Sequence, residues 1–482
     1  MADAKIVIIG AGASGIAAAT RLLENGFENI IILEAENRIG GRINSVPLDG
    51  GFVDIGGQWV HGEKGNIVYE MVKDLDLVTP SSLPKDPGMS FFLSDGSMAD
   101  KTITDRLFAI IMAVKDDKDT AGKFLGSFAQ YITIEYKKRV LNEFGANARI
   151  LELSEMVLKW FQKFMVLLNP AETWDQLSTT SHYVFQPCEG DQLLGWRKSG
   201  YRTIIDVMTK RIPDPSKQLP LEDKILLNKE VSQIIWDADD ETHDVLVNCT
   251  DGSAYPAHHV IVTVSVGVLK DIYATCFEPP LPEYKINSIE GVPLGTVNKI
   301  LLKFPTKWWP DTMKDISFLW SEEDRNALLD EVSAGPIVNG KSWLENLFSF
   351  IAIDSHPNVL LGWVNGPTAK LVELLPDETV IESTMYMLRK FAGRLYHIPE
   401  PDVIVRSKWG SNPHFKGSYA YVNAQMEKTK ASANDLAQPL MKNSRPVVQF
   451  AGEATHSTLF STVNGAMETG YREAERIISL YK

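Results

Sequence analysis

The hydrophobic pattern near the N-terminus predicts a strand, a helix and a second strand. Ile6–Ile9 and Ile30–Leu33 are short runs of branched apolar residues, which is typical of strands covered on both faces in a parallel sheet. Between them, Ile16–Leu23 is rich in alanine and leucine and is expected to be helical, with Asn25-Gly26 as its C-terminal stop. The chain is therefore expected to open on part of an α/β fold.

Further apolar runs predict strands in the middle of the chain and near its end. Asp251-Gly252 is a hairpin signal between two of these strands. The predicted strands are Lys229–Ile234, Val245–Cys249, His259–Val264 and Val447–Phe450, the last of which precedes a final helix. Helical patterns occupy Thr104–Val114, Ser154–Leu168 and Glu378–Phe391, and we find no internal repeat.

Composition narrows the class of protein. The 482 residues are 44% hydrophobic and 23% charged, which excludes fibrous and disordered chains. With 48 basic and 62 acidic residues, the net charge of -14 argues against nucleic acid or an anionic membrane as a partner and suits a cationic small molecule. Cys188, Cys249 and Cys276 are too widely spaced to indicate a metal site or a disulfide framework.

The chain shows no targeting signal that we recognise. Lys5–Ile9 runs directly into a glycine motif instead of forming a signal peptide, and no apolar run is long enough to cross a bilayer. The ending Leu480-Tyr481-Lys482 is not a peroxisomal tripeptide of the Ser-Lys-Leu kind. We therefore expect a cytoplasmic protein, and the sequence does not indicate its oligomeric state.

The glycine motif predicts a dinucleotide site. Residues 10–15 read GAGASG, and Glu34 stands at the end of the second strand. Gly10 permits a tight turn, Gly12 lets the backbone approach a pyrophosphate, and Gly15 lets the helix pack on the sheet. Ala13 and Ser14 begin the helix whose N–H groups face the anion, and a carboxylate at Glu34 accepts from ribose hydroxyls.

The residues that follow resemble the FAD signature of the flavin amine oxidases. Residues 34–42 read EAENRIGGR, in which the family places Gly41 and Arg42 at the diphosphate of FAD. Residues 451–474 are similar to the C-terminal flavin-binding segment of that family. The resemblance implies that Glu453 holds the ribityl chain, that Thr462 and Val463 meet the pyrimidine end of the flavin, and that Val231 meets the adenine.

The resemblance also implies the architecture. The fold class is α/β, with a Rossmann-like FAD-binding domain interleaved with an α+β substrate-binding domain. We expect residues 1–80, 200–304 and 426–482 in the FAD-binding domain, and residues 81–199 and 305–425 in the substrate-binding domain. The chain has no cysteine after Cys276, so FAD is expected to be bound noncovalently.

One motif resembles the polyamine oxidases that back-convert spermine or N1-acetylated polyamines. Residues 56–62 read GGQWVHG, which implies Gly57, Gln58 and Trp59 as cofactor residues and His61 as a catalytic and substrate-binding residue. By the same resemblance, Lys299 reaches the flavin N5 edge through a water, and Trp409 faces the flavin. Further candidates for substrate binding are the aromatic residues Tyr419 and Tyr421 and the acids Glu63, Glu189 and Asp191.

The implied reaction is hydride transfer from a polyamine to FAD. Hydrolysis of the imine releases a shorter polyamine and an aminoaldehyde, and O2 is reduced to H2O2. Two other hypotheses stay open: another soluble flavin amine or L-amino-acid oxidase, and a catalytically silent FAD-binding scaffold. The sequence does not choose between spermine and N1-acetylated substrates, and no metal is expected.

Overall fold

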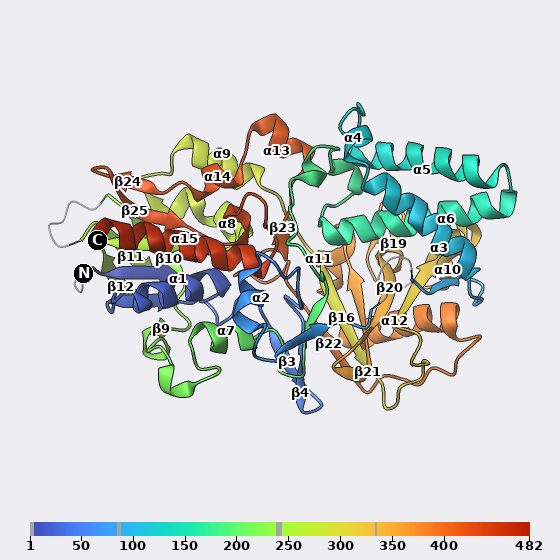
Figure 1. Cartoon of the computed structure of the whole chain (residues 1–482), viewed down its shortest axis with the longest axis horizontal. Coiled ribbons are helices and arrows are strands. Elements are labelled where there is room, and N and C mark those ends of the chain that lie inside the picture. Colours follow the sequence, from blue (N-terminus) through green and yellow to red (C-terminus); the bar gives the residue numbers. More distant parts are fainter. Residues whose placement is uncertain (1–3, 84–87, 238–242, 333–334) are drawn as a thin grey trace.

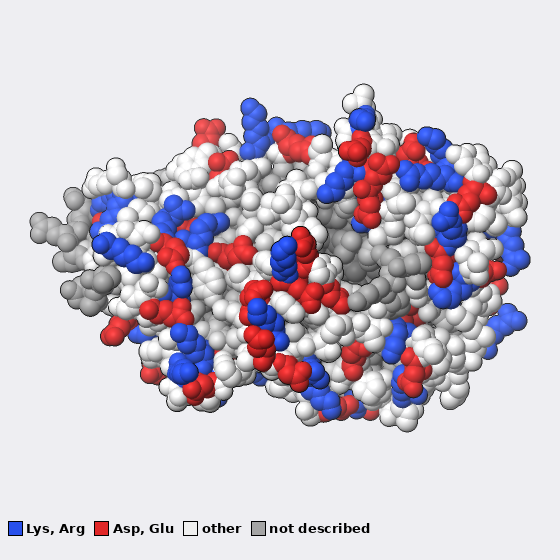
Figure 2. Space-filling model, viewed as in Figure 1, with Lys and Arg blue, Asp and Glu red and all other residues white. Residues whose placement is uncertain are grey.

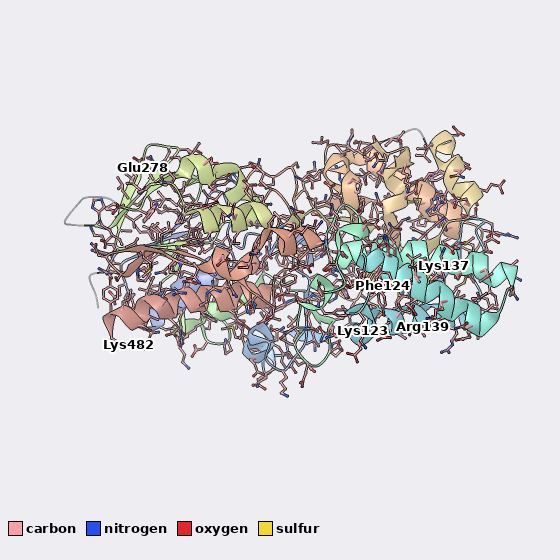
Figure 3. All side chains as sticks on the ribbon, turned by 90° about the horizontal axis from the view of Figure 1, so that it is seen from above. Lys123, Phe124, Lys137, Arg139, Glu278 and Lys482 are labelled. Carbon is pink, nitrogen blue, oxygen red and sulfur yellow. The ribbon has the colours of Figure 1, made fainter. Side chains whose placement is uncertain are left out.

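The computed structural model describes residues 4–83, 88–237, 243–332 and 335–482. The elements gather into two halves that lie end to end along the long axis, each with a six-stranded sheet (Figure 1). Seen from above, Glu278 and Lys482 lie toward one end, and Lys137 and Arg139 lie toward the other (Figure 3). Both termini lie at the same end of the molecule (Figure 1).

The first sheet contains the two N-terminal strands. β1 (Ile6–Ile9) lies at its centre and pairs in parallel with β2 (Ile30–Leu33) on one side and β13 (His259–Val262) on the other. The outer strands are β9 (Ile225–Leu226) beyond β2, then β25 (Arg445–Phe450) and β24 (Leu440–Lys442) beyond β13. The carboxyl ends of β1 and β2 therefore meet at one edge, which is where such sheets bind dinucleotides.

Helices from the two ends of the chain cover one face of this sheet. α1 (Ala13–Glu24) and α15 (Val463–Tyr481) lie side by side (Figure 1). They approach so closely that a Cβ on Gly470 would lie 2.2 Å from the carbonyl oxygen of Ser14. Only glycine fits at such a contact, and it joins the last helix to the first.

The other face carries a smaller sheet and two helices. The sheet consists of β12 (Ala254–Ala257), β11 (Val245–Cys249), β10 (Val231–Ile235) and β14 (Phe277–Glu278), and the helices are α8 (Val266–Cys276) and α9 (Glu283–Gly291). The predicted hairpin at Asp251-Gly252 is present, with Gly252 at φ +83°. Its second strand is β12, whereas β13, which we had expected as one of the neighbouring strands, enters the main sheet.

The second half is built on a mostly antiparallel sheet. Its order is β22 (Val403–Arg406), β16 (Asn298–Lys303), β21 (His356–Val364), β20 (Leu347–Ile353), β17 (Asp315–Leu319) and β7 (Phe91–Leu93). α3 (Lys101–Lys115), α5 (Phe128–Phe144) and α6 (Ala148–Leu168) cover one face, and α12 (Asp377–Ala392) covers the other. Side chains alternate along β16, with Leu301 on the first face and Ile300 and Leu302 on the second.

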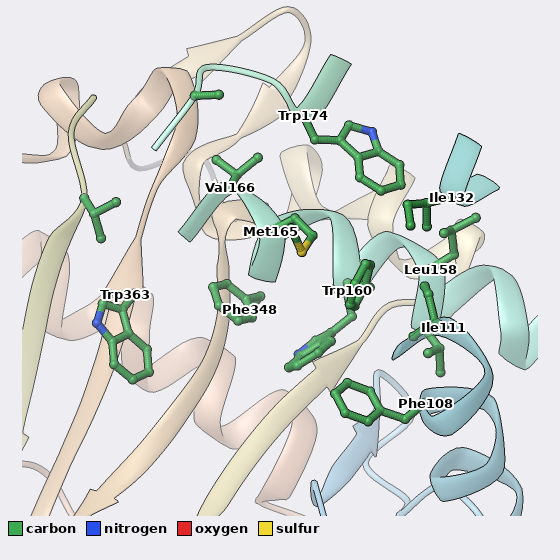
Figure 4. Packing of buried hydrophobic residues seen from close by; sticks show 14 of the residues in the cluster. Phe108, Ile111, Ile132, Leu158, Trp160, Met165, Val166, Trp174, Phe348 and Trp363 are labelled. Carbon is green, nitrogen blue, oxygen red and sulfur yellow. The ribbon is translucent and has the colours of Figure 1, made fainter. Parts of the chain in front are cut away.

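Aromatic side chains fill the core between α6 and the sheet. Trp160 packs edge-on against Phe348 of β20, with ring centroids 5.6 Å apart, and Trp363 of β21 belongs to the same cluster (Figure 4). Leu301 of β16, the strand that carries Lys299, is part of this core.

Shorter elements complete the two halves. The small sheets pair β3 (Ser45–Leu48) with β4 (Gly51–Asp54), β15 (Leu294–Gly295) with β23 (Tyr419–Ala420), β18 (Ile337–Val338) with β19 (Lys341–Ser342), and β8 (Leu194–Trp196) with both β5 (Trp59–Val60) and β6 (Val78–Pro80). The remaining helices are α2 (Ile67–Val72), α4 (Lys118–Ala121), α7 (Thr203–Met208), α10 (Glu322–Glu331), α11 (Ala369–Val372), α13 (Ala424–Thr429) and α14 (Ala433–Ala437).

The predicted fold class is confirmed, and the structure differs in where some segments pair. β16 is hydrogen-bonded into the second sheet, although the sequence placed residues up to 304 in the first domain. β8 pairs with β5 and β6 of the first 80 residues, although residues 81–199 were assigned to the second domain. Over the described residues, no helix is both long and apolar enough to span a bilayer.

Candidate functional site

A cavity of about 990 Å³ runs between the two halves of the molecule. Figure 2 shows a hollow on this face, with basic and acidic side chains interspersed around it. Residues from both ends of the chain and from the middle line the cavity together. Of the predicted cofactor residues, those on its lining are Gly10, Gly12, Ala13, Ser14, Glu34, Gly41, Arg42, Gly57, Gln58, Trp59, Val231, Trp409, Glu453, Thr462 and Val463.

The glycines after β1 form a cradle at one end of the cavity. Gly10 turns the chain at φ +104°, and a Cβ on Gly15 would lie 2.0 Å from the Gly10 carbonyl oxygen. Gly15 therefore packs behind the lining and not on it. A Cβ on Gly12 would meet nothing nearer than 4.0 Å and would project into cavity space. The second glycine loop joins this cradle, because the N–H of Gly40 donates to the Ala11 carbonyl at 2.8 Å.

Glu34 is buried beside this cradle. Its Oε2 accepts from the N–H of Ala11 at 2.7 Å, and its Oε1 accepts from the N–H of Glu36 at 2.9 Å. Burial raises the pKa of this carboxyl, and the two backbone hydrogen bonds partly oppose the rise. Each oxygen retains a lone pair, so Glu34 can still accept from two hydroxyl groups on a ribose.

An ion pair joins the N-terminal and C-terminal parts of the lining. Nη1 of Arg42 lies 2.8 Å from Oε1 of Glu453 and also donates to the Ser418 carbonyl at 2.9 Å. The other oxygen of Glu453 accepts from the N–H of Ser461 at 2.9 Å. Ser461 directly precedes Thr462, whose hydroxyl caps the start of α15. The N-terminus of this long helix therefore faces the cavity, where its dipole favours negative charge.

Lys299 reaches the cavity from β16. Its Nζ donates to the carbonyl oxygens of Asp54 at 2.9 Å and Gly56 at 2.8 Å, and to Oε1 of Gln58 at 2.6 Å. All three N–H donors of the ammonium group are thus engaged by the last residue of β4 and the loop that follows it. Burial lowers the pKa of Lys299, and the negative charge of Asp54 opposes this shift.

Asp54 is a site residue that the sequence analysis missed. Its carboxylate accepts from the Ser45 hydroxyl and from the N–H of Tyr201 at 3.0 Å. Burial raises its pKa, while these hydrogen bonds and the charge of Lys299 oppose the rise. An acid at the end of a strand, two residues before a Gly-Gly pair, was the available signal.

His61 is held with one nitrogen free toward the cavity. Its Nδ1 lies 2.7 Å from the Gln192 carbonyl, which only accepts, so Nδ1 carries the proton. In the neutral ring, Nε2 is then an acceptor, and His61 lines the cavity. His61 is exposed to the cavity, but the protein groups packed around the ring displace water from it and lower its pKa, and the bond to Gln192 opposes this. Nε2 of His61 can therefore accept a hydrogen bond from an N–H group of a bound ligand.

Aromatic side chains form the walls near Lys299. The Trp409 indole donates to the Ile55 carbonyl at 3.2 Å, and the Tyr419 hydroxyl donates to the Leu167 carbonyl at 2.5 Å. Trp363, which the sequence analysis did not single out, also lines the cavity. Tyr421 does not reach the lining, because it is buried in the neighbouring core with its hydroxyl 3.2 Å from Oε1 of Gln176.

The predicted acidic residues lie outside the cavity. Glu189 pairs with Lys64 at 3.0 Å, and both side chains are highly exposed. Glu63 and Asp191 contact each other, because Oε2 of Glu63 accepts a hydrogen bond from the N–H of Asp191 at 3.3 Å. None of the three acids lines the cavity. At the outer end of the lining, the acid is Asp116, which we had not predicted.

Comparisons with known proteins agree with this geometry. The family described as flavin containing amine oxidoreductase matches residues 13–478. The chain is 30% identical to a human peroxisomal N(1)-acetyl-spermine/spermidine oxidase, covering 99% of this chain and 95% of the relative. It is 28% identical to a probable polyamine oxidase 5 of Arabidopsis thaliana, covering 99% of each chain.

A solved structure shares the fold. A redesigned double mutant of putrescine oxidase superimposes with a TM-score of 0.64 at 18% identity and covers 99% of each chain. The family match extends over nearly all of the sequence, and the glycine cradle, Glu34 and the Arg42–Glu453 pair line the same cavity. The chain belongs to the family of flavin-containing amine oxidoreductases.

Proposed function

We propose that this protein is an FAD-dependent polyamine oxidase that acts on N1-acetylated spermine and spermidine, on spermine, or on both. The single observation that carries this proposal is the continuous cavity, which extends from Glu34 and the glycine cradle to Lys299, His61 and an aromatic wall. The names of the human and Arabidopsis relatives support the choice of polyamines. The negative charge of the chain suits a cationic substrate.

The resemblance to the flavin amine oxidases suggests which residues would hold FAD, and their places on the cavity lining support these roles. Glu34 accepts from the adenine ribose, and Val231 meets the adenine. The glycine cradle, Gly41 and Arg42 bind the diphosphate, with Ala13 and Ser14 at the helix N-terminus. Glu453 holds the ribityl chain, and Thr462 and Val463 present the start of α15 to the pyrimidine ring. Gly57, Gln58, Trp59 and Trp409 enclose the rest of the flavin ring.

We further propose that FAD is bound noncovalently. Cys276 is the cysteine on the cavity lining, and it precedes Phe277, which pairs with Ile234 of β10, the strand that begins at Val231. Burial raises the pKa of its thiol to about 12, which disfavours the reactive thiolate. The cofactor should therefore separate from the protein on denaturation.

The residues near Lys299 would position and deprotonate the amine. When bound, FAD supplies the acceptor for two electrons, which O2 then takes up to form H2O2. His61 accepts a hydrogen bond from the substrate N–H, and the amine must reach its neutral form before its neighbouring carbon releases a hydride. Water hydrolyses the resulting imine to an aminoaldehyde and a shorter polyamine. The rate should rise with pH as the bound amine loses its proton.

A panel of amines tests the proposal and its rivals. The purified protein should be yellow and should release H2O2 with N1-acetylspermine or spermine. Peroxide with tyramine or leucine, and none with polyamines, would instead identify another amine or amino-acid oxidase. A yellow protein that yields no peroxide with any amine would be an FAD-binding scaffold.

We also propose a cytoplasmic location. The three cysteines are all free, which suits a reducing compartment. Because the human relative is named as peroxisomal, fractionation of cells that produce the untagged protein provides the test. Recovery with peroxisomes would contradict the proposal.

A further inference from the structure

His182 occupies the outer part of the cavity lining and is held by ring contacts. It is the middle residue of a 3-10 turn, Ser181–Tyr183, and its ring stacks on Phe128 with centroids 4.2 Å apart. Tyr183 packs edge-on at 4.9 Å and anchors the turn by donating from its hydroxyl to the Lys115 carbonyl at 2.7 Å. Phe128 is fully buried, so the plane of the His182 ring is fixed.

The two ring nitrogens of His182 have different surroundings. Nδ1 is buried and has no hydrogen-bond partner within the described parts of the chain. The side chain is half-buried and lines the cavity, so we assign Nε2 to the cavity side of the ring. Burial lowers the pKa of His182 to about 4, and Lys115 and Lys118 lower it further against a smaller opposing effect of Asp116. The ring is therefore neutral near pH 7 and carries a single N–H.

The buried nitrogen decides where that proton resides. An unpaired buried N–H is rarer in proteins than an unpaired acceptor, so Nδ1 is the bare nitrogen and Nε2 carries the proton. The cavity lining then offers a neutral N–H donor at this point. A carbonyl oxygen can accept from it, but an ammonium group cannot, because it has only donors.

The charges nearby also disfavour an ammonium group. Lys115 and Lys118 line the cavity beside His182. Nζ of Lys118 lies 5.4 Å from the centre of the Tyr183 ring. Asp116 is the acid at this end, and its carboxylate already pairs with Lys115 at 2.7 Å and is 65% exposed. A free polyamine terminus would therefore meet the positive charge of Lys118 and a Lys115–Asp116 pair whose charges already compensate each other.

We propose that Nε2–H of His182 donates a hydrogen bond to the carbonyl oxygen of an N-acyl group at the far end of the substrate. His182 is then a specificity-determining residue that favours amide-capped polyamines over free ones. This inference rests on the proposed polyamine oxidase function and adds to it the group that reads the acyl cap. Phe128 and Tyr183 are positioning residues, because they act through the His182 ring.

Two substitutions at His182 separate the hydrogen bond from the packing. His182→Phe keeps the stack on Phe128 and removes the N–H, whereas His182→Gln can restore a donor near the position of Nε2. N1-acetylspermine is compared with N1-ethylspermine, which has the same length but an amine in place of the amide. Flavin content and thermal midpoint are measured for each variant to verify folding.

We expect a loss of activity that is selective for the acetylated substrate and that the amide N–H of His182→Gln restores. In His182→Phe, kcat/KM for N1-acetylspermine should fall about tenfold to a hundredfold, mainly through KM, as the loss of one specific hydrogen bond implies. The kcat/KM of His182→Phe for N1-ethylspermine should change by less than about threefold. His182→Gln should recover most of the kcat/KM that His182→Phe loses for N1-acetylspermine.

Other outcomes overturn the inference and identify what failed. If the wild-type protein oxidises both substrates and His182→Phe affects them equally or not at all, the assignment of His182 is wrong and the polyamine oxidase function stands. If the wild-type protein oxidises neither substrate, the proposed function fails and this inference fails with it.

Discussion

The guanidinium Nη1 of Arg42 lies 2.8 Å from Oε1 of Glu453, although the two residues are 411 positions apart in the chain. The Glu453 side chain is 6% exposed and that of Arg42 is 24% exposed, so water screens this pair only in part. Because both residues line the cavity, the contact joins the diphosphate end of the proposed FAD site to its ribityl end.

Removal of the negative charge of Glu453 should weaken FAD binding. In Glu453→Gln, Arg42 loses its partner and the proposed ribityl contact changes, so we expect the Kd for FAD to rise at least about tenfold. Titration of the apoprotein with FAD, followed by flavin fluorescence, measures this change.

Glu475→Gln provides a matched control. Arg21 and Glu475 also join α1 to α15, at 2.5 Å, but both side chains are more than 40% exposed and neither lines the cavity. The FAD Kd should stay at its wild-type value in this variant. An equal loss in both variants would show that affinity depends on helix docking and not on the pair in the cavity.

Replacement by alanine should have different effects at two glycines of the same motif. A Cβ on Gly15 would collide with the Gly10 carbonyl, whereas a Cβ on Gly12 would meet only cavity space. We expect Gly15→Ala to lower the melting temperature of the apoprotein by several degrees, as a core clash of about 1–3 kcal/mol implies. Gly12→Ala should leave that temperature near its wild-type value and still lose FAD.

Calorimetry measures the melting temperatures of the apoproteins, and titration with FAD measures the affinity of each variant. A Gly12→Ala protein that binds FAD with wild-type affinity would place the diphosphate elsewhere. A Gly15→Ala protein as stable as the wild type would show that the sheet can shift to accept the methyl group.

Lys299→Met should slow reduction of the bound flavin. The change leaves the carbonyl groups of Asp54 and Gly56 and the Gln58 side chain without their donor, and it leaves the buried Asp54 carboxylate without its countercharge. We expect the anaerobic reduction rate with N1-acetylspermine to fall at least about tenfold, since misplacement of positioning groups commonly has that effect. Stopped-flow absorbance measures the rate.

Lys303→Met on the same strand serves as the control. Lys303 faces Asp49 at 3.3 Å and Asp402 at 3.2 Å and lies outside the cavity. The flavin of Lys303→Met should be reduced at the wild-type rate. A normal rate in Lys299→Met would contradict a role for Lys299 in the reaction.

The folded protein should lose stability on mild acidification. His259 is fully buried, and burial lowers its pKa from 6.5 to about 4. Between pH 6.5 and pH 4 the unfolded chain therefore binds one proton that the folded chain does not, so the free energy of unfolding falls as the pH falls. One such group contributes about 1.4 kcal/mol per pH unit, or about 3 kcal/mol over the window.

Urea unfolding at several pH values measures this slope. His259→Asn can keep the donor to the Pro446 carbonyl, which lies 2.8 Å from Nδ1, but does not titrate. Its slope between pH 4 and pH 6.5 should be smaller than the wild-type slope by one proton. Parallel slopes would mean that His259 does not titrate as its burial implies.

The N-terminal half of the site was predictable because its constraints are local. β1, β2 and Glu34 are fixed by short apolar runs and by glycines whose spacing has a steric reason, and the strands have the bounds that the pattern indicated. Lys299 and His61 were found through family motifs. Asp54 was missed because its role depends on Lys299, which approaches it from the other half of the molecule.

The outer end of the cavity was not predictable for a related reason. His182 is held by Phe128, a residue of α5 that no motif marks, and Asp116 follows the end of α3. The packing of α3 and α5 against α6 brings these residues to the cavity, and their order in the sequence carries no sign of it. Glu189 was chosen for its charge, but it lies outside the lining with Lys64.

An anaerobic titration of the purified yellow protein with N1-acetylspermine tests the proposed reaction most directly. The flavin absorbance should bleach completely at about one equivalent of substrate, because hydride transfer carries both electrons. Admission of air should restore the absorbance and yield one equivalent of H2O2. An unchanged spectrum with both N1-acetylspermine and spermine, or a purified protein that takes up no FAD, would contradict the proposed function.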